Sequence, residues 1–200
     1  THTWTGDHTG AVGRLNPREL KSILKEIPAQ PDFFSNAYLN HNTLADAVRA
    51  YMHELFGKEG LISLDADDPS LKRLFLPIIQ QELTAPKSAE IVYETTQRLN
   101  KMGYHTPLHA REINLFYLVD QLRERIVKED QLYKVLNTEI SFTEEELLAL
   151  TESNPERFSP NVILRPVYEE VILPNLAYIG GPSEVPYWLQ LKDLFDAYQV

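Results

Sequence analysis

Apolar residues in the first part of the chain recur at the three- and four-residue spacing of amphipathic helices. One helix is predicted after Asn16, which precedes Pro17 and can cap the first turn. A longer helix is predicted from Asn42 or Thr43 to Gly57, since glycine suits the end of a helix. Two helices with defined ends are thus expected before residue 60.

Proline and capping residues predict the helices that follow. Pro77 should kink or split the helix in which it lies, because it cannot donate the backbone hydrogen bond. Glu146 stands three residues after a threonine, the spacing of a capping box. The predicted helix starts, in chain order, are Pro69, Pro86, Thr143, Pro160 and Ser183.

Short apolar runs between these helices predict strands. They are Thr1–Trp4, Leu61–Leu64, Ile113–Val119, Leu132–Leu136 and Leu176–Ile179. Strands that alternate with helices indicate an α/β domain, so we expect a mainly parallel sheet flanked by helices. The 200 residues are expected to form one such domain rather than two.

Composition and charge narrow the possible functions. The chain has no cysteine, which excludes disulfides, thiolate catalysis and cysteine-bound metals within it. Its net charge of −10 argues against a broad nucleic-acid-binding surface, and its apolar runs are far shorter than a membrane span. We therefore expect a cytoplasmic domain that binds neither nucleic acid nor membrane.

The segment from Leu176 to Glu184 is the first candidate for chemistry. Gly180 and Gly181 lie between a predicted strand and a capped helix, where the backbone can approach a ligand and free N–H groups attract an anion. The spacing is not that of a nucleotide-binding glycine motif, so a tight structural turn is an equal alternative. Glu184 has its own simple explanation as an acidic residue in a first helical turn.

Aspartate and histidine residues raise the question of a metal site. Asp65 and Asp67 follow an apolar run, as in the D-x-D element of metal-dependent glycosyltransferases. The simpler explanation is that Asp68 caps the helix begun by Pro69. His105 and His109 are four residues apart, but an intervening proline makes a helix there improbable. No metal site is expected.

Polar residues surround the predicted strand Ile113–Val119. A local arginine cluster in an acidic chain can bind a carboxylate or a phosphate in bidentate fashion. Surface ion pairs with Glu112 and Glu124 are an equally good explanation. The residues concerned are Arg111, Glu112, Asn114, Arg123 and Arg125.

Several segments together resemble the bacillithiol synthase family, the cysteine-adding enzymes of bacillithiol biosynthesis. The longest and most specific runs are Ser159–Tyr168, Leu173–Glu184 and Tyr187–Lys192. Shorter ones are Arg111–Tyr117, Asp65–Pro69 and Gly10–Arg14, so the likeness covers nearly the whole chain.

The resemblance implies a Rossmann-like core, connecting helical segments and a coiled coil through which the enzyme dimerises. It implies a ligase that joins cysteine to glucosaminyl-malate, and a homo-oligomer. On this reading residues 1–200 are a fragment of the core, without its amino-terminal half and without the coiled coil. The isolated fragment is therefore expected to be inactive.

Such a reaction requires an activated carboxyl group, for which ATP is one candidate cofactor, and it requires anion binding, a cation and a general base. Gly180 and Gly181 suit the anion-binding loop, Arg165 the cation and Glu184 the base. The remaining candidates for substrate binding are Asn114, Tyr178, Tyr187 and Trp188.

Two other functions remain open from the residues alone. One is a metal-dependent glycosyltransferase-like domain that uses Asp65 and Asp67 to bind a nucleotide sugar. The other is a half-domain that binds a ligand or acts as a scaffold without catalysis.

Overall fold

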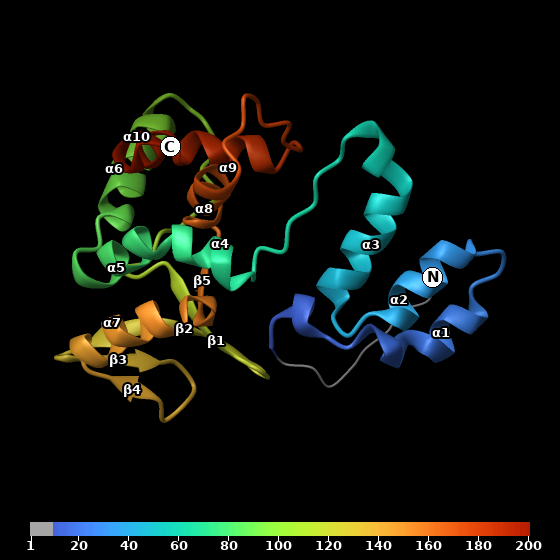
Figure 1. Ribbon diagram of the computed structural model, residues 1–200. Coiled ribbons are helices and arrows are strands. Elements are labelled where there is room, and N and C mark those ends of the chain that lie inside the picture. Colours follow the sequence, from blue (N-terminus) through green and yellow to red (C-terminus); the bar gives the residue numbers. More distant parts are fainter. Residues whose placement is uncertain (1–9) are drawn as a thin grey trace. The chain divides into compact units, whose positions relative to one another are not determined.

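The computed structural model describes residues 10–200, and the chain divides into two compact units (Figure 1). The first unit comprises Thr1–Ala66 and Leu118–Arg123, and the second comprises Asp67–Tyr117 and Glu124–Val200. The strand predicted at Thr1–Trp4 lies outside the described residues.

Between residues 10 and 66, the first unit is built from helices. Thr43 begins the longest one as predicted, because its side chain accepts a hydrogen bond of 3.1 Å from the N–H of Asp46. The ring of Tyr51 lies 5.4 Å from that of Phe34 and 6.0 Å from that of Tyr38, so aromatic side chains join the two long helices. The elements are the 3-10 turns η1 (Val12–Arg14), η2 (Pro17–Leu20) and η3 (Gly57–Glu59), and helices α1 (Lys21–Glu26), α2 (Asp32–Asn40) and α3 (Leu44–Phe56).

The second unit holds seven α-helices among its described residues. The split predicted at Pro77 is confirmed, since one helix ends at Leu74 and the next begins at Leu76. The capping box of Thr143 and Glu146 is confirmed as well. The helices are α4 (Pro69–Leu74), α5 (Leu76–Thr84), α6 (Ser88–Lys101), α7 (Glu144–Ser153), α8 (Arg165–Ile172), α9 (Glu184–Gln190) and α10 (Lys192–Tyr198).

A five-stranded sheet has the strand order β4-β3-β2-β1-β5, and helices lie beside it (Figure 1). The α/β class is confirmed, and the strands predicted at Ile113–Val119 and Leu132–Leu136 correspond to β1 and β3. The short turn η4 (Pro155–Arg157) leads into the last strand. The strands are β1 (Leu115–Val119), β2 (Leu122–Glu129), β3 (Leu132–Val135), β4 (Ser141–Phe142) and β5 (Phe158–Pro160).

The prediction of a mainly parallel sheet is wrong. β1 pairs with β5, β2 with β3 and β3 with β4, each in antiparallel register. Only Asp120 and Gln121 separate β1 from β2, and only Asp130 and Gln131 separate β2 from β3. Two residues suffice for a hairpin, whereas a parallel connection needs a dozen or more, so these short turns dictate the antiparallel arrangement.

Two predicted strands and one predicted helix start are also wrong. Leu61–Leu64 and Leu176–Ile179 form no strand, and the side chain of Ile179 is 96% exposed. Among residues 10–200, neither run pairs with a strand of the sheet. Pro160 ends β5, and the helix that follows begins at Arg165.

The core of the second unit lies where α4, α5 and α8 meet the sheet. Phe75 and Ile79 are completely buried, and the ring of Phe75 packs 5.0 Å from that of Tyr168. The hydroxyl of Tyr133 donates a hydrogen bond of 2.7 Å to the carbonyl of Leu83, which fixes β3 to α5. Within residues 10–200 no helix has both the length and the apolar character needed to cross a bilayer.

Candidate functional site

A charged group that we call the Arg165 cluster consists of Arg165, Tyr178, Glu184 and Tyr187. Arg165 lies in the first turn of α8, where its Nη1 contacts Glu169 Oε2 at 3.0 Å and its Nη2 donates to the hydroxyl of Tyr187 at 2.7 Å. Tyr178 acts on both Arg165 and Glu184, since it raises the pKa of Arg165 and lowers the pKa of Glu184. The start of α8, the 176–183 loop and α9 thus bring these side chains together.

The electrostatics of the Arg165 cluster keep its charged groups ionised. The pKa of Glu184 is lowered, chiefly by the hydrogen bond from the N–H of Gly181, then by Tyr178 and the charge of Arg165. Burial acts to lower the pKa of Arg165, but the hydrogen bond to Tyr187 and nearby charges outweigh it, so that pKa is raised. At neutral pH the cluster therefore presents a guanidinium and a carboxylate together.

Tyr178 belongs both to the Arg165 cluster and to the wall of a pocket of about 310 Å³. The rings of Tyr178 and Trp188 stack with centroids 3.6 Å apart and planes 11° apart, and Phe195 lies 5.3 Å from Trp188. This volume is at the lower end of the range for small-molecule pockets. The lining residues are Glu170, Asn175, Leu176, Ala177, Tyr178, Trp188, Phe195 and Val200.

The two glycines of the 180–181 turn have different roles. A Cβ at Gly180 would lie 2.8 Å from the ring of Tyr178, so only glycine allows the ring to stack where it does. A Cβ at Gly181 would make only ordinary contacts, but its N–H donates a hydrogen bond of 3.0 Å to Glu184 Oε2. The side chain of Ser183 makes no capping hydrogen bond, so Glu184 orders this turn.

Asn114 is not a member of the Arg165 cluster and belongs to a buried polar network. Its side chain is completely buried and donates to Glu82 Oε1 at 3.0 Å and to Ser88 Oγ at 2.7 Å. It also accepts from the N–H of Arg111 and donates to the carbonyl of Arg111, and Asn161 donates to its Oδ1 at 2.8 Å. Asn114 therefore anchors the backbone that precedes β1.

The aspartates of the 65–68 segment have local structural partners. Asp68 caps α4 as predicted, since its Oδ1 accepts from the N–H of Ser70 at 2.8 Å. Asp67 forms an ion pair of 3.8 Å with Lys72. No group of three or more histidine, aspartate or glutamate side chains able to hold a metal ion occurs in the described part of the chain.

Two buried charged residues, Lys72 and Glu82, escaped the sequence analysis. Lys72 is 1% exposed and donates a hydrogen bond of 2.7 Å to the carbonyl of Phe158. Glu82 accepts hydrogen bonds from Ser88 and Asn114, while burial raises its pKa. Their spacing in the sequence could have predicted this burial. Lys72 lies three residues before Phe75 and Glu82 three residues after Ile79, which places both on an apolar helix face.

A charged cluster that shares Tyr178 with an aromatic pocket is a combination typical of small-molecule sites. The family model "Bacillithiol biosynthesis BshC, N-terminal Rossmann-like domain" matches residues 2–200. The chain belongs to this family.

Curated relatives agree with the family model. A protein of Flavobacterium psychrophilum is 47% identical over 99% of this chain, and one of Cytophaga hutchinsonii is 43% identical over 98%. A protein of Staphylococcus haemolyticus is 37% identical over 77% of the chain. Each bears the name "Putative cysteine ligase BshC". The matches cover 39%, 38% and 29% of those proteins, so the chain spans about two fifths of the length of the first two.

Proposed function

We propose that this chain is part of a ligase that joins cysteine to glucosaminyl-malate to form bacillithiol. Membership of the BshC family and the names of the relatives support the assignment. The observation that carries it is the Arg165 cluster beside the aromatic pocket. Since the relatives are much longer, the proposal concerns the longer protein, and turnover by residues 1–200 alone is not expected.

The chemistry gives Arg165 and Glu184 catalytic roles. When an amine attacks an activated carboxyl group, negative charge develops on the oxygen and the nitrogen becomes a strongly acidic ammonium. A guanidinium suits the oxygen, and Arg165 supplies it. A carboxylate with a lowered pKa, such as Glu184, is a weak base towards a free amine but can accept a proton from that ammonium.

The remaining candidates serve substrate binding in this proposal. Tyr178 and Trp188 form an aromatic wall on which a sugar ring can pack, and Tyr187 orients Arg165. Gly180 and Gly181 allow the loop to approach the substrate closely. Asn114 is the exception: it is completely buried and bonded inside the protein, so in this proposal it supports the fold and does not contact the substrate.

Several parts of the proposal rest on the family resemblance alone. They are activation of the carboxyl group by ATP, a cytoplasmic location and assembly as a homo-oligomer with its coiled coil in the rest of the protein. A metal-dependent glycosyltransferase is less well supported, because Asp67 pairs with Lys72 and Asp68 caps α4.

The test is an assay of the full-length protein with cysteine and glucosaminyl-malate, with and without ATP, in which mass spectrometry detects bacillithiol. Glu184→Gln should lower kcat about 100-fold, the usual scale for loss of an acid–base group. The amide oxygen can still accept from Gly181, so thermal stability should change little.

Glu94→Gln is the matched control. Glu94 is exposed on α6 and has no hydrogen-bond or ion-pair partner among residues 10–200, so its activity should equal that of the wild type. Absence of bacillithiol under all conditions would reject the ligase and leave the non-catalytic alternative. Normal activity of Glu184→Gln would reject the role of Glu184 only.

A further inference from the structure

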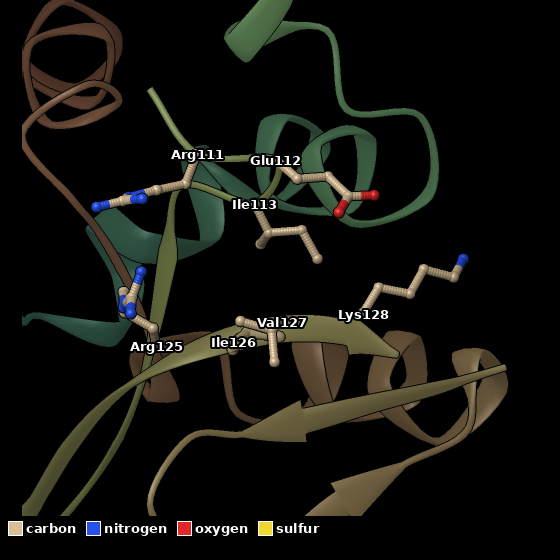
Figure 2. Close-up of a pocket in the computed structure, with 7 residues that line it drawn as sticks. All are labelled: Arg111, Glu112, Ile113, Arg125, Ile126, Val127 and Lys128. Carbon is tan, nitrogen blue, oxygen red and sulfur yellow. The ribbon is translucent and has the colours of Figure 1, made fainter. Parts of the chain in front are cut away.

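A second pocket in the same unit lies between the segment before β1 and the strand β2, and has a volume of about 150 Å³ (Figure 2). Ile113 points from the upper segment towards β2, where Ile126 and Val127 lie, so the middle of the pocket is apolar. The lining residues are Arg111, Glu112, Ile113, Arg125, Ile126, Val127 and Lys128.

Charge is distributed unevenly around this pocket. Three cationic side chains and one carboxylate line it, although the chain as a whole has a net charge of −10. Figure 2 shows the guanidinium groups of Arg111 and Arg125 at one end, and Glu112 with Lys128 at the other. One end of the pocket is therefore purely cationic.

Among residues 10–200, the guanidinium groups of the two arginines differ from the ammonium group of Lys128, because they have no internal partner. Lys128 donates to the hydroxyl of Tyr133 at 3.0 Å and contacts Glu144 Oε2 at 3.2 Å. Within the described part of the chain, the guanidinium groups of Arg111 and Arg125 have neither a hydrogen bond nor an ion pair. Their donors are thus free to bind an external group.

The backbone on both sides of the pocket is held in place. Asn114 accepts from the N–H of Arg111 at 3.1 Å and donates to its carbonyl at 2.7 Å. The carbonyl of Arg125 accepts from the N–H of Leu136 at 3.0 Å, and the adjacent Ile126 is 1% exposed. The ligand therefore has to order only the two arginine side chains, which lowers the cost of binding.

We infer that this pocket binds the anionic group of a small molecule, a phosphate or a carboxylate, between Arg111 and Arg125. Guanidinium groups donate two parallel hydrogen bonds to such oxygens, and the apolar middle suits a short carbon skeleton. The volume of about 150 Å³ is enough for an oxyanion on a short carbon skeleton. The inference is independent of the ligase proposal.

Calorimetric titration of the full-length protein, at constant ionic strength, tests the inference. Inorganic phosphate and succinate are titrated separately, and the tighter of the two identifies the class of anion. Arg111→Gln and Arg125→Gln should each weaken binding about 10-fold or more, since each removes a charge-assisted hydrogen bond. Glu112→Gln should tighten it, because it removes the one carboxylate that lines the pocket among residues 10–200.

Arg73→Gln is the control variant. Arg73 is an exposed arginine of α4 that donates to the carbonyl of Glu152 and does not line the pocket, so anion affinity should be unchanged. Failure of both anions to bind at about 50 mM would overturn the inference. So would equal affinity of the wild type and the variant that carries both Arg111→Gln and Arg125→Gln. Thermal melting of the variants should match the wild type, because neither guanidinium has a partner to lose within the described part of the chain.

Discussion

Replacement of Asn114 by alanine tests whether this residue organises the second unit from within. The side chain makes five hydrogen bonds, with Glu82, Ser88, Asn161 and both backbone groups of Arg111. Because Asn114 is completely buried, water cannot replace these bonds without opening the structure.

The expected loss of stability follows from the groups left without a partner. Each buried polar group that loses its hydrogen bond costs about 1–3 kcal/mol, and the carboxyl of Glu82 and the peptide of Arg111 are the most affected. These contributions are not additive, because the bonds share one side chain. We expect Asn114→Ala to lower the free energy of unfolding by about 3–5 kcal/mol, which corresponds to a fall in Tm of about 10 °C.

The assay is urea denaturation followed by circular dichroism, with Asn175→Ala as control. Asn175 belongs to the same unit and also donates from its side chain to a glutamate, Glu170, but on the exposed surface. Its replacement should cost about 0.5 kcal/mol or less. A loss below about 1 kcal/mol for Asn114→Ala would refute the reasoning, since the network would then be dispensable.

The two buried charges give the remaining predictions. Lys72→Met keeps an apolar stem but removes the hydrogen bond to the carbonyl of Phe158, so it should lower the free energy of unfolding by about 1–3 kcal/mol. The control is Lys101→Met, which replaces an exposed lysine. Equal stability of Lys72→Met and the wild type would contradict this prediction. Burial raises the pKa of Glu82, so the folded chain keeps this proton to higher pH than the unfolded chain, and stability is lost as pH rises from about 4.5 through the folded pKa. Glu82→Gln lacks this titration, so urea denaturation between pH 4 and pH 7 should show its stability improving relative to the wild type as pH rises; a constant difference would exclude the raised pKa.

Local signals in the sequence predicted the helix ends well. Thr43, Asp68 and Thr143 each bond to a backbone N–H two or three residues ahead, so the interaction is contained in the sequence itself. The break before Pro77 has the same local origin.

The sheet was predicted less well because its direction depends on turn lengths. The β2 sequence Leu122–Glu129 is mostly charged and was interpreted as a polar fringe, so the hairpin turn at Asp120 went unnoticed. Once β2 is recognised, the two-residue spacing fixes antiparallel pairing. The run Leu176–Ile179 shows the reverse error: its composition suits a strand, but pairing needs a neighbour that local sequence cannot reveal.

The sequence predicted those site residues that lie close together along the chain, but not the contacts between distant elements. Arg165, Tyr178 and Glu184 lie within twenty residues of one another, and the structure brings them together. Asn114 is different, because its partners Glu82 and Ser88 come from α5 and the start of α6. Only the packing of separate elements identifies it as an internal anchor.

The stack of Tyr178 on Trp188 also gives the protein an intrinsic optical reporter. The chain has only two tryptophans, so Trp4→Phe would leave Trp188 as its single indole fluorophore. That indole lines the 310 Å³ pocket and contacts a tyrosine ring directly, so an occupant that displaces water there would change its emission. Occupancy of the aromatic pocket can then be followed by fluorescence without any attached label, separately from events at the pocket between Arg111 and Arg125.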